Sequence, residues 1–215
     1  MAKHTFKLSD VTPDARIIAR SALGYDFNYY ADAETLLFGS TDETAFRMQN
    51  ITPGTGISTG TNTLYSGNVT VAGDLIKTEI FIDLTGLNSN AVGDIIGKDG
   101  GTANCHIGQI TSALCGTIFA GTLQSLETPA GGEPDIDLFA ATEATGAEDA
   151  AVSGLTETQL LEMNADLSAS NLGTPFVLSA FPAADQYLYL TGGGGTTDDT
   201  YTAGKLLITL YGKPA

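Results

Sequence analysis

The segment Ile76–Leu84 constrains the fold most strongly, because its residues alternate in character with a period of two. Its even positions are apolar or Thr, and three of its odd positions are charged: Lys77, Glu79 and Asp83. That alternation predicts a strand with one buried face. Residues 64–72 predict its hairpin partner, with Gly73 and Asp74 at the turn.

Further strands are predicted along the rest of the chain, with turn-forming residues between them: His106–Thr111, Thr117–Leu126, Asp135–Ala140, Phe176–Phe181, Gln186–Thr191 and Lys205–Tyr211. The composition agrees, because 29 Thr and 26 Gly in 215 residues favour strands and turns over helices. We therefore predict an all-β protein, in which residues 61–215 form a two-sheet antiparallel β-sandwich that is jelly-roll-like. An immunoglobulin-type sandwich competes with this interpretation, but the chain has no Trp.

One helix is expected inside the sandwich sequence. The segment 155–163 predicts a short helix with Thr156 as its cap. The stretch 142–171 around it is long for a plain loop, so we expect it to cover a sheet edge or an interface.

The first sixty residues differ from the rest and are predicted to form an N-terminal arm, residues 1–60. Within it, residues 12–24 predict a short helix, because Thr12 can cap its start, Pro13 needs no hydrogen-bond partner there and Gly24 permits the exit. Residues 51–63 contain three Gly and five Thr, which predicts a flexible connection to the sandwich.

Aromatic residues cluster in the arm at residues 25–30. One interpretation is an apolar patch that covers an end of the domain, and the other is contact with a partner subunit, since Tyr is favoured in buried interface cores. The predicted partner-contact residues are Phe6, Ile17, Ile18, Tyr25, Phe27, Tyr29 and Tyr30.

The net charge of −16 is distributed unevenly. Residues 121–203 contain 13 acidic residues, and no Lys or Arg occurs between Asp99 and Gly204. Such a surface repels phosphate backbones and anionic lipids, so we expect neither nucleic acid nor membrane as a partner. No apolar stretch is long enough to span a membrane, and the N-terminus has no secretory signal pattern.

No catalytic, cofactor-binding or metal-binding residues are predicted. His106 and Cys105 are adjacent, which places them on opposite faces of a strand and prevents them from acting as a dyad. Cys115 fits no metal spacing, and Gly192–Gly195 reads as a turn. Acidic residues gather in one predicted loop, at Glu127, Glu133, Asp135 and Asp137, and in a second pair, Asp198 and Asp199. We interpret them as solvated loops, with a structural cation site or an acidic docking face as the alternative.

Several segments of the predicted sandwich resemble structural proteins of marine tailed bacteriophages: Ile76–Ser89, Asp94–Gly97, His106–Thr111, Leu126–Gly132, Asp135–Leu138, Pro182–Thr191 and Tyr201–Lys205. The resemblance covers roughly residues 55–212 and consists of strand and turn sequence. It therefore indicates a virion component without naming an active site.

Within a virion, a small acidic β-sandwich with an arm is similar to capsid decoration, or cement, proteins. The resemblance implies synthesis in the host cytoplasm, a place on the outer capsid surface, and two partners, the major capsid protein and further copies of the chain, with a trimer expected. A fibre or receptor-binding β-sandwich module is the first alternative, with Tyr187, Tyr189 and Tyr201 as candidate groove residues. For these three tyrosines, packing in the core is the favoured interpretation. A carbohydrate-binding module is the second, although it would be expected to use Trp.

Overall fold

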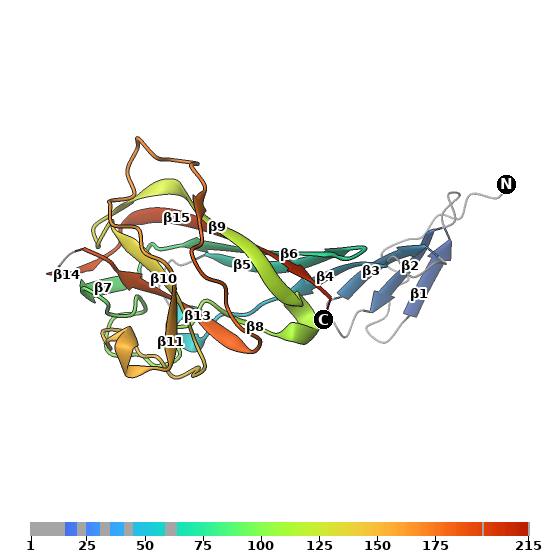
Figure 1. The fold of residues 1–215 in the computed structure, drawn as a ribbon, viewed down its shortest axis with the longest axis horizontal. Coiled ribbons are helices and arrows are strands. Elements are labelled where there is room, and N and C mark those ends of the chain that lie inside the picture. The colour runs from blue at the N-terminus through green and yellow to red at the C-terminus, as the bar shows by residue number, and fades with distance from the viewer. Residues whose placement is uncertain are drawn as a thin grey trace.

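The structure is a computed structural model, and it describes residues 16–20, 25–30, 35–40, 45–58, 64–194 and 196–214. Its main feature is a nine-stranded sheet in which every neighbouring pair is antiparallel (Figure 1). In spatial order the strands are β1 (Arg16–Arg20), β2 (Tyr25–Tyr30), β3 (Thr35–Ser40), β4 (Ala45–Asn50), β5 (Tyr65–Ala72), β6 (Leu75–Asp83), β15 (Ala203–Lys213), β9 (Thr117–Ala130) and β12 (Phe176–Val177).

A second antiparallel sheet of four strands completes the sandwich. Its spatial order is β11 (Glu157–Leu161), β10 (Ile136–Ala141), β13 (Gln186–Gly192) and β8 (Gly108–Ile110). A separate pair joins β7 (Asn88–Ala91) and β14 (Thr196–Thr200). The helices among the described residues are single turns: α1 (Thr55–Ser58), α2 (Ser112–Cys115) and the 3-10 helix η2 (Val152–Gly154).

Eight strands of the sandwich body, all except β5, pair in a nested order. Strand β6 pairs with β15, β8 with β13, β9 with β12, and β10 with β11. The first of these eight strands therefore pairs with the last, the second pairs with the next to last, and the same holds for the two inner pairs. Two further pairings, β15 with β9 and β13 with β10, join these four pairs into the two sheets.

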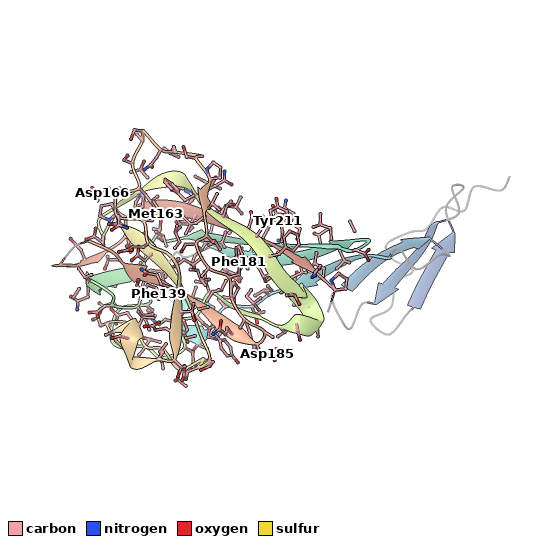
Figure 2. All side chains as sticks on the ribbon, viewed as in Figure 1. Phe139, Met163, Asp166, Phe181, Asp185 and Tyr211 are labelled. Atoms are coloured by element: carbon pink, nitrogen blue, oxygen red, sulfur yellow. The ribbon has the colours of Figure 1, made fainter. Side chains whose placement is uncertain are left out.

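The apolar sides of the two sheets form one core. Fully buried residues come from the large sheet, such as Ile80 and Ile208, and from the small sheet, such as Leu138 and Leu188. Figure 2 shows side chains filling the body between the sheets. The all-β, two-sheet prediction is thus confirmed, and so are the predicted strands at β5, β6, β9, β10, β13 and β15. The finer jelly-roll assignment stays a prediction.

Neither predicted helix is helical in the described residues, and a strand occupies part of each. Arg16–Arg20 is β1, paired with β2, while residues 12–15 and 21–24 lie outside the described residues. The predicted helix over 155–163 contains β11, paired with β10. In each case a neighbouring strand supplies the backbone hydrogen bonds, and tertiary pairing of this kind overrides a weak local propensity. The adjacent β-branched residues Ile17 and Ile18 also suit a strand better than a helix.

Residues 51–58, which the sequence predicted to be flexible, pack into the body. Ile57 in α1 is fully buried. The backbone N–H of Gly54 donates to the His106 carbonyl at 2.9 Å, and that of Gly56 to the Asn104 carbonyl at 3.2 Å. A Cβ on Gly56 would lie 2.3 Å from Cys105 Sγ, so the close approach requires glycine. The flexible-connection prediction is wrong for these residues, while residues 59–63 lie outside the described part of the chain.

We predict that Ile57→Ala lowers the free energy of unfolding by about 2–5 kcal/mol, because it opens a cavity in a packed core. Urea unfolding followed by circular dichroism measures this difference. Ser58→Ala, at the exposed neighbouring position, is the matched control and should have little effect. Equal stability of the two variants would show that α1 does not pack on the body in solution.

Candidate functional site

Most of the predicted partner-contact residues lie on two neighbouring strands. Ile17 and Ile18 belong to β1, and the aromatic residues of 25–30 belong to β2. The register sets Ile17 opposite Tyr29. Phe6 lies outside the described residues. The structure thus brings the described members of the set together, and their contact role stays a prediction.

Three acidic residues meet where β10 begins: Glu133, Asp135 and Asp137. They are 5%, 7% and 8% exposed, so the prediction of solvated acidic side chains is wrong for them. Asp135 and Asp137 approach the same glycine, since a Cβ on Gly193 would lie 2.6 Å from Asp135 Oδ1 and 3.2 Å from Asp137 Oδ1. Glu133 Oε1 accepts a hydrogen bond from the backbone N–H of Asp135 at 3.1 Å.

In this acidic cluster, formed by Glu133, Asp135 and Asp137, the surroundings favour the protonated form of Asp135. Burial, followed by repulsion from Asp137 and Glu133, raises the pKa of Asp135 to about 6. Asp135 Oδ1 has no hydrogen-bond partner among the described residues. Burial also raises the pKa of Asp137, although its Oδ1 accepts from the Met163 backbone N–H at 2.8 Å. Asp166 lies beside Met163 at the end of the body away from β1 (Figure 2), and its charge further raises the pKa of Asp135.

Glu127, which the sequence grouped with these residues, has a different role. It forms an ion pair with Lys205, and Asp83 Oδ2 lies 3.6 Å from the same Lys205 Nζ. Among the described residues, no group of three or more His, Cys, Asp or Glu could hold a metal ion. The second predicted pair is not described as a pair, since only Asp199 has a described side chain, which accepts from its neighbour's backbone at 3.1 Å.

Sequence reasoning missed a second buried carboxyl group, Glu148, which is 2% exposed. Its oxygens accept hydrogen bonds from the Gly101 backbone N–H at 2.8 Å and from Asn88 Nδ2 at 3.3 Å. Burial, together with the neighbouring Asp149, raises the pKa of Glu148 to about 7. Glu148 therefore ties the loop at residue 101 to β7. The adjacent pair Glu148–Asp149 carries no sequence pattern that would have predicted burial.

The adjacent Cys105 and His106 offer no nucleophile. Burial raises the pKa of the Cys105 thiol to about 11, so it is protonated at neutral pH. Burial lowers the pKa of His106, whose ring lies 4.8 Å from that of Tyr187. Cys115 is a buried free thiol.

Two of the three tyrosines proposed for a surface groove are core residues. Tyr189 is fully buried, and its hydroxyl donates to the Glu143 carbonyl at 2.7 Å. Tyr201 is 1% exposed, and its hydroxyl donates to the Glu133 carbonyl at 2.7 Å. Only Tyr187 is partly exposed. The favoured core-packing interpretation is therefore confirmed for Tyr189 and Tyr201, and the groove alternative is excluded for both.

A hollow of about 560 Å³ lies next to β14 and the loop after β7, lined by Thr85, Gly86, Lys98, Asp99, Thr200, Tyr201 and Thr202. Its lining combines hydroxyl groups with one residue of each charge, and it contains no pair of carboxylates or nucleophile with a base.

No family model, curated protein or solved structure matches the chain. Within the described residues, no helix is long and apolar enough to cross a membrane.

We predict that Asp135→Asn raises the free energy of unfolding at pH 7 by about 1–3 kcal/mol, since one pKa unit corresponds to about 1.4 kcal/mol. The pKa of Asp135 is higher in the folded state than in the unfolded chain, so the folded state binds the proton more tightly. Wild-type stability therefore falls as the pH rises from about 4 to about 6, and the variant removes this loss.

Urea unfolding of both proteins at pH 4 and pH 7 measures the effect, which should be small at pH 4. Asp74→Asn, in the exposed turn between β5 and β6, is the control and should change stability little at either pH. A variant that is less stable than wild type at pH 7 would show that the Asp135 charge is stabilised by groups beyond those described.

Proposed function

We propose that the chain is a structural protein of a tailed-phage virion that decorates the outer capsid surface and cements neighbouring major capsid subunits. The observation that carries the proposal is the continuation of the large sheet through β4 to β1, beyond the sandwich (Figure 1). A compact body with a projecting set of strands can contact two subunits at once. Many such weak contacts, repeated over a lattice, bind strongly through avidity.

We also propose that the body is a jelly roll, an architecture found in viral capsid and lectin domains. The nested pairing of β6 with β15, β8 with β13, β9 with β12 and β10 with β11 supports this assignment. In a jelly roll a long antiparallel ribbon wraps so that its strands pair in this order across two sheets. The absence of any Lys or Arg between Asp99 and Gly204 suits a particle surface that must stay soluble.

The fibre or receptor-binding alternative is less well supported, because Tyr189 and Tyr201 are buried and form no surface groove. The two roles differ in copy number. A cement protein is present in hundreds of copies per particle, and a fibre module in a few dozen at most.

We therefore predict that this chain approaches the major capsid protein in molar amount in purified virions. Quantitative mass spectrometry of the particles, with labelled peptides of both proteins as standards, measures the ratio. A molar ratio typical of a fibre would support the fibre role in place of the cement role. Absence of this chain from infectious particles would contradict the proposed function.

We predict that deletion of residues 1–50 lowers capsid occupancy at least tenfold, because it removes β1–β4 and with them the second contact. Pelleting of decoration-free capsids with added protein measures occupancy. Thermal unfolding of the shortened chain controls for an intact body. Unchanged occupancy would show that the arm is not the contact.

A further inference from the structure

Two buried oxygen atoms on one face of the four-stranded sheet have no hydrogen-bond partner in the described part of the chain. They are Asp135 Oδ1, immediately before β10, and Thr191 Oγ1 on β13. Asp135 is 7% exposed, and Thr191 is fully buried. Buried polar atoms nearly always have a partner, so two unpartnered oxygens on one face point to a group that binds them.

The strand register brings both oxygens close to Asp137. Thr191 pairs directly with Asp137. Gly193 lies opposite Asp135, since the N–H of Gly193 donates to the Asp135 carbonyl at 2.7 Å. Partners across antiparallel strands share a face, with Cβ atoms about 4.5–5.5 Å apart, and so do residues two apart along one strand. Asp135, Asp137 and Thr191 therefore form one group on the face of the sheet that is turned away from the core, and we call it the oxygen cluster.

Glycine at position 193 lets the two carboxylates of the oxygen cluster approach each other. A Cβ on Gly193 would lie 2.6 Å from Asp135 Oδ1 and 3.2 Å from Asp137 Oδ1. The two oxygens thus converge on one point beside the backbone of Gly193, and no side chain separates them there. A side chain at this position would have to displace Asp135, which gives one glycine of the run Gly192–Gly195 a role beyond that of a turn former.

The partners of these carboxylates in the described residues are neutral. Asp137 accepts hydrogen bonds from the Met163 backbone N–H at 2.8 Å and from Gln159 Nε2 at 3.4 Å. Lys205, the first basic residue after them in the chain, forms its ion pairs with Glu127 and Asp83 instead. Buried carboxylates are normally paired with a cation or coordinate a metal ion, so the oxygen cluster lacks a positive charge.

We propose that the oxygen cluster binds a calcium ion. The site is independent of the proposed function. Calcium is a hard cation that takes roughly six to eight oxygen ligands in a flexible geometry, whereas magnesium demands a near-ideal octahedron and keeps several waters. No group of three or more His, Cys, Asp or Glu in the described residues could hold a metal ion, so two carboxylates supply the charge and neutral oxygens, including that of Thr191, complete the coordination.

The segment after β11 lies over the oxygen cluster. The Met163 N–H donates to Asp137, the Leu167 N–H donates to the Pro134 carbonyl at 2.9 Å, and Figure 2 shows Met163 and Asp166 side by side at this end of the body. A bound cation therefore links β10 and β13 beneath this segment. Two carboxylates are a low charge count, which predicts a weak site with a dissociation constant of about 10⁻⁴–10⁻³ M.

The test compares Asp135→Asn with Asp74→Asn in the full-length chain. Isothermal titration with calcium chloride should give wild type one site per chain. Asp135→Asn should weaken binding by about tenfold or more, because it removes a charged ligand. Asp74→Asn, in the exposed turn between β5 and β6, removes the same charge elsewhere and should bind like wild type. Sodium chloride keeps the ionic strength constant, so that screening of the acidic surface does not contribute.

Two further variants test the ligand set without removing a charge. Thr191→Val keeps the shape of the side chain and removes the hydroxyl, so it should weaken calcium binding. Gly193→Ala places a Cβ 2.6 Å from Asp135 Oδ1 and should abolish it. Gly154→Ala, whose Cβ would meet nothing within 4 Å, is the matched control and should bind like wild type. Circular dichroism checks that each variant is folded.

Thermal unfolding gives a second readout. In EDTA at pH 7, Asp135→Asn should be more stable than wild type, as predicted above from the loss of its buried charge. Calcium at about 10 mM should raise the unfolding temperature of wild type and change that of Asp135→Asn little, because a ligand that binds only the folded state stabilises it.

Wild type that takes up no calcium would overturn the inference, as would calcium binding that Asp135→Asn leaves unchanged, since the ion would then lie elsewhere on the acidic surface. Weaker binding in Asp135→Asn, Thr191→Val and Gly193→Ala, with both controls unchanged, would confirm it.

Discussion

The C-terminal strand β15 is the element on which the rest of the sandwich depends. It is hydrogen-bonded on both sides, to β6 and to β9. Its inward residues Leu206, Ile208 and Leu210 are fully buried. Without β15 the large sheet would divide into β1–β6 on one side and β9 with β12 on the other. Because β15 pairs with β6, which lies far from it in the sequence, the fold is dominated by contacts between distant segments, and this favours slow folding.

The sequence predicts strands well where one face is buried. The alternation in Ile76–Leu84 and Lys205–Tyr211 identifies β6 and β15, because it records which residues meet the core. The order of strands in the sheets is not recorded in any single segment, since it depends on which distant strands pair. The two helix predictions failed for a related reason. A capping residue such as Thr156 is a local signal, and β11 is determined by its pairing with β10.

The acidic cluster shows which features of a site can be predicted from the alternation of apolar and charged residues along a strand. Asp135 and Asp137 alternate with Ile136 and Leu138, which correctly separates the two faces of β10. The sequence did not show that the second face is covered as well. The backbone N–H of Met163 donates to Asp137 and that of Leu167 donates to the Pro134 carbonyl at 2.9 Å, so the segment after β11 closes over the carboxylates. Every residue of β10 is consequently buried, and raised pKa values follow from that burial.

The exchange of apolar sides between β4 and β5 connects the fold to its proposed role. From β5 to β9 the large sheet turns its apolar side toward the four-stranded sheet, whereas the register of β1–β4 gives the opposite side to Phe27, Phe38 and Phe46. A sheet that is apolar on different sides along its width needs two covering layers. The body supplies one of them. Under the proposed function, a neighbouring subunit of the virion would supply the layer on the other side.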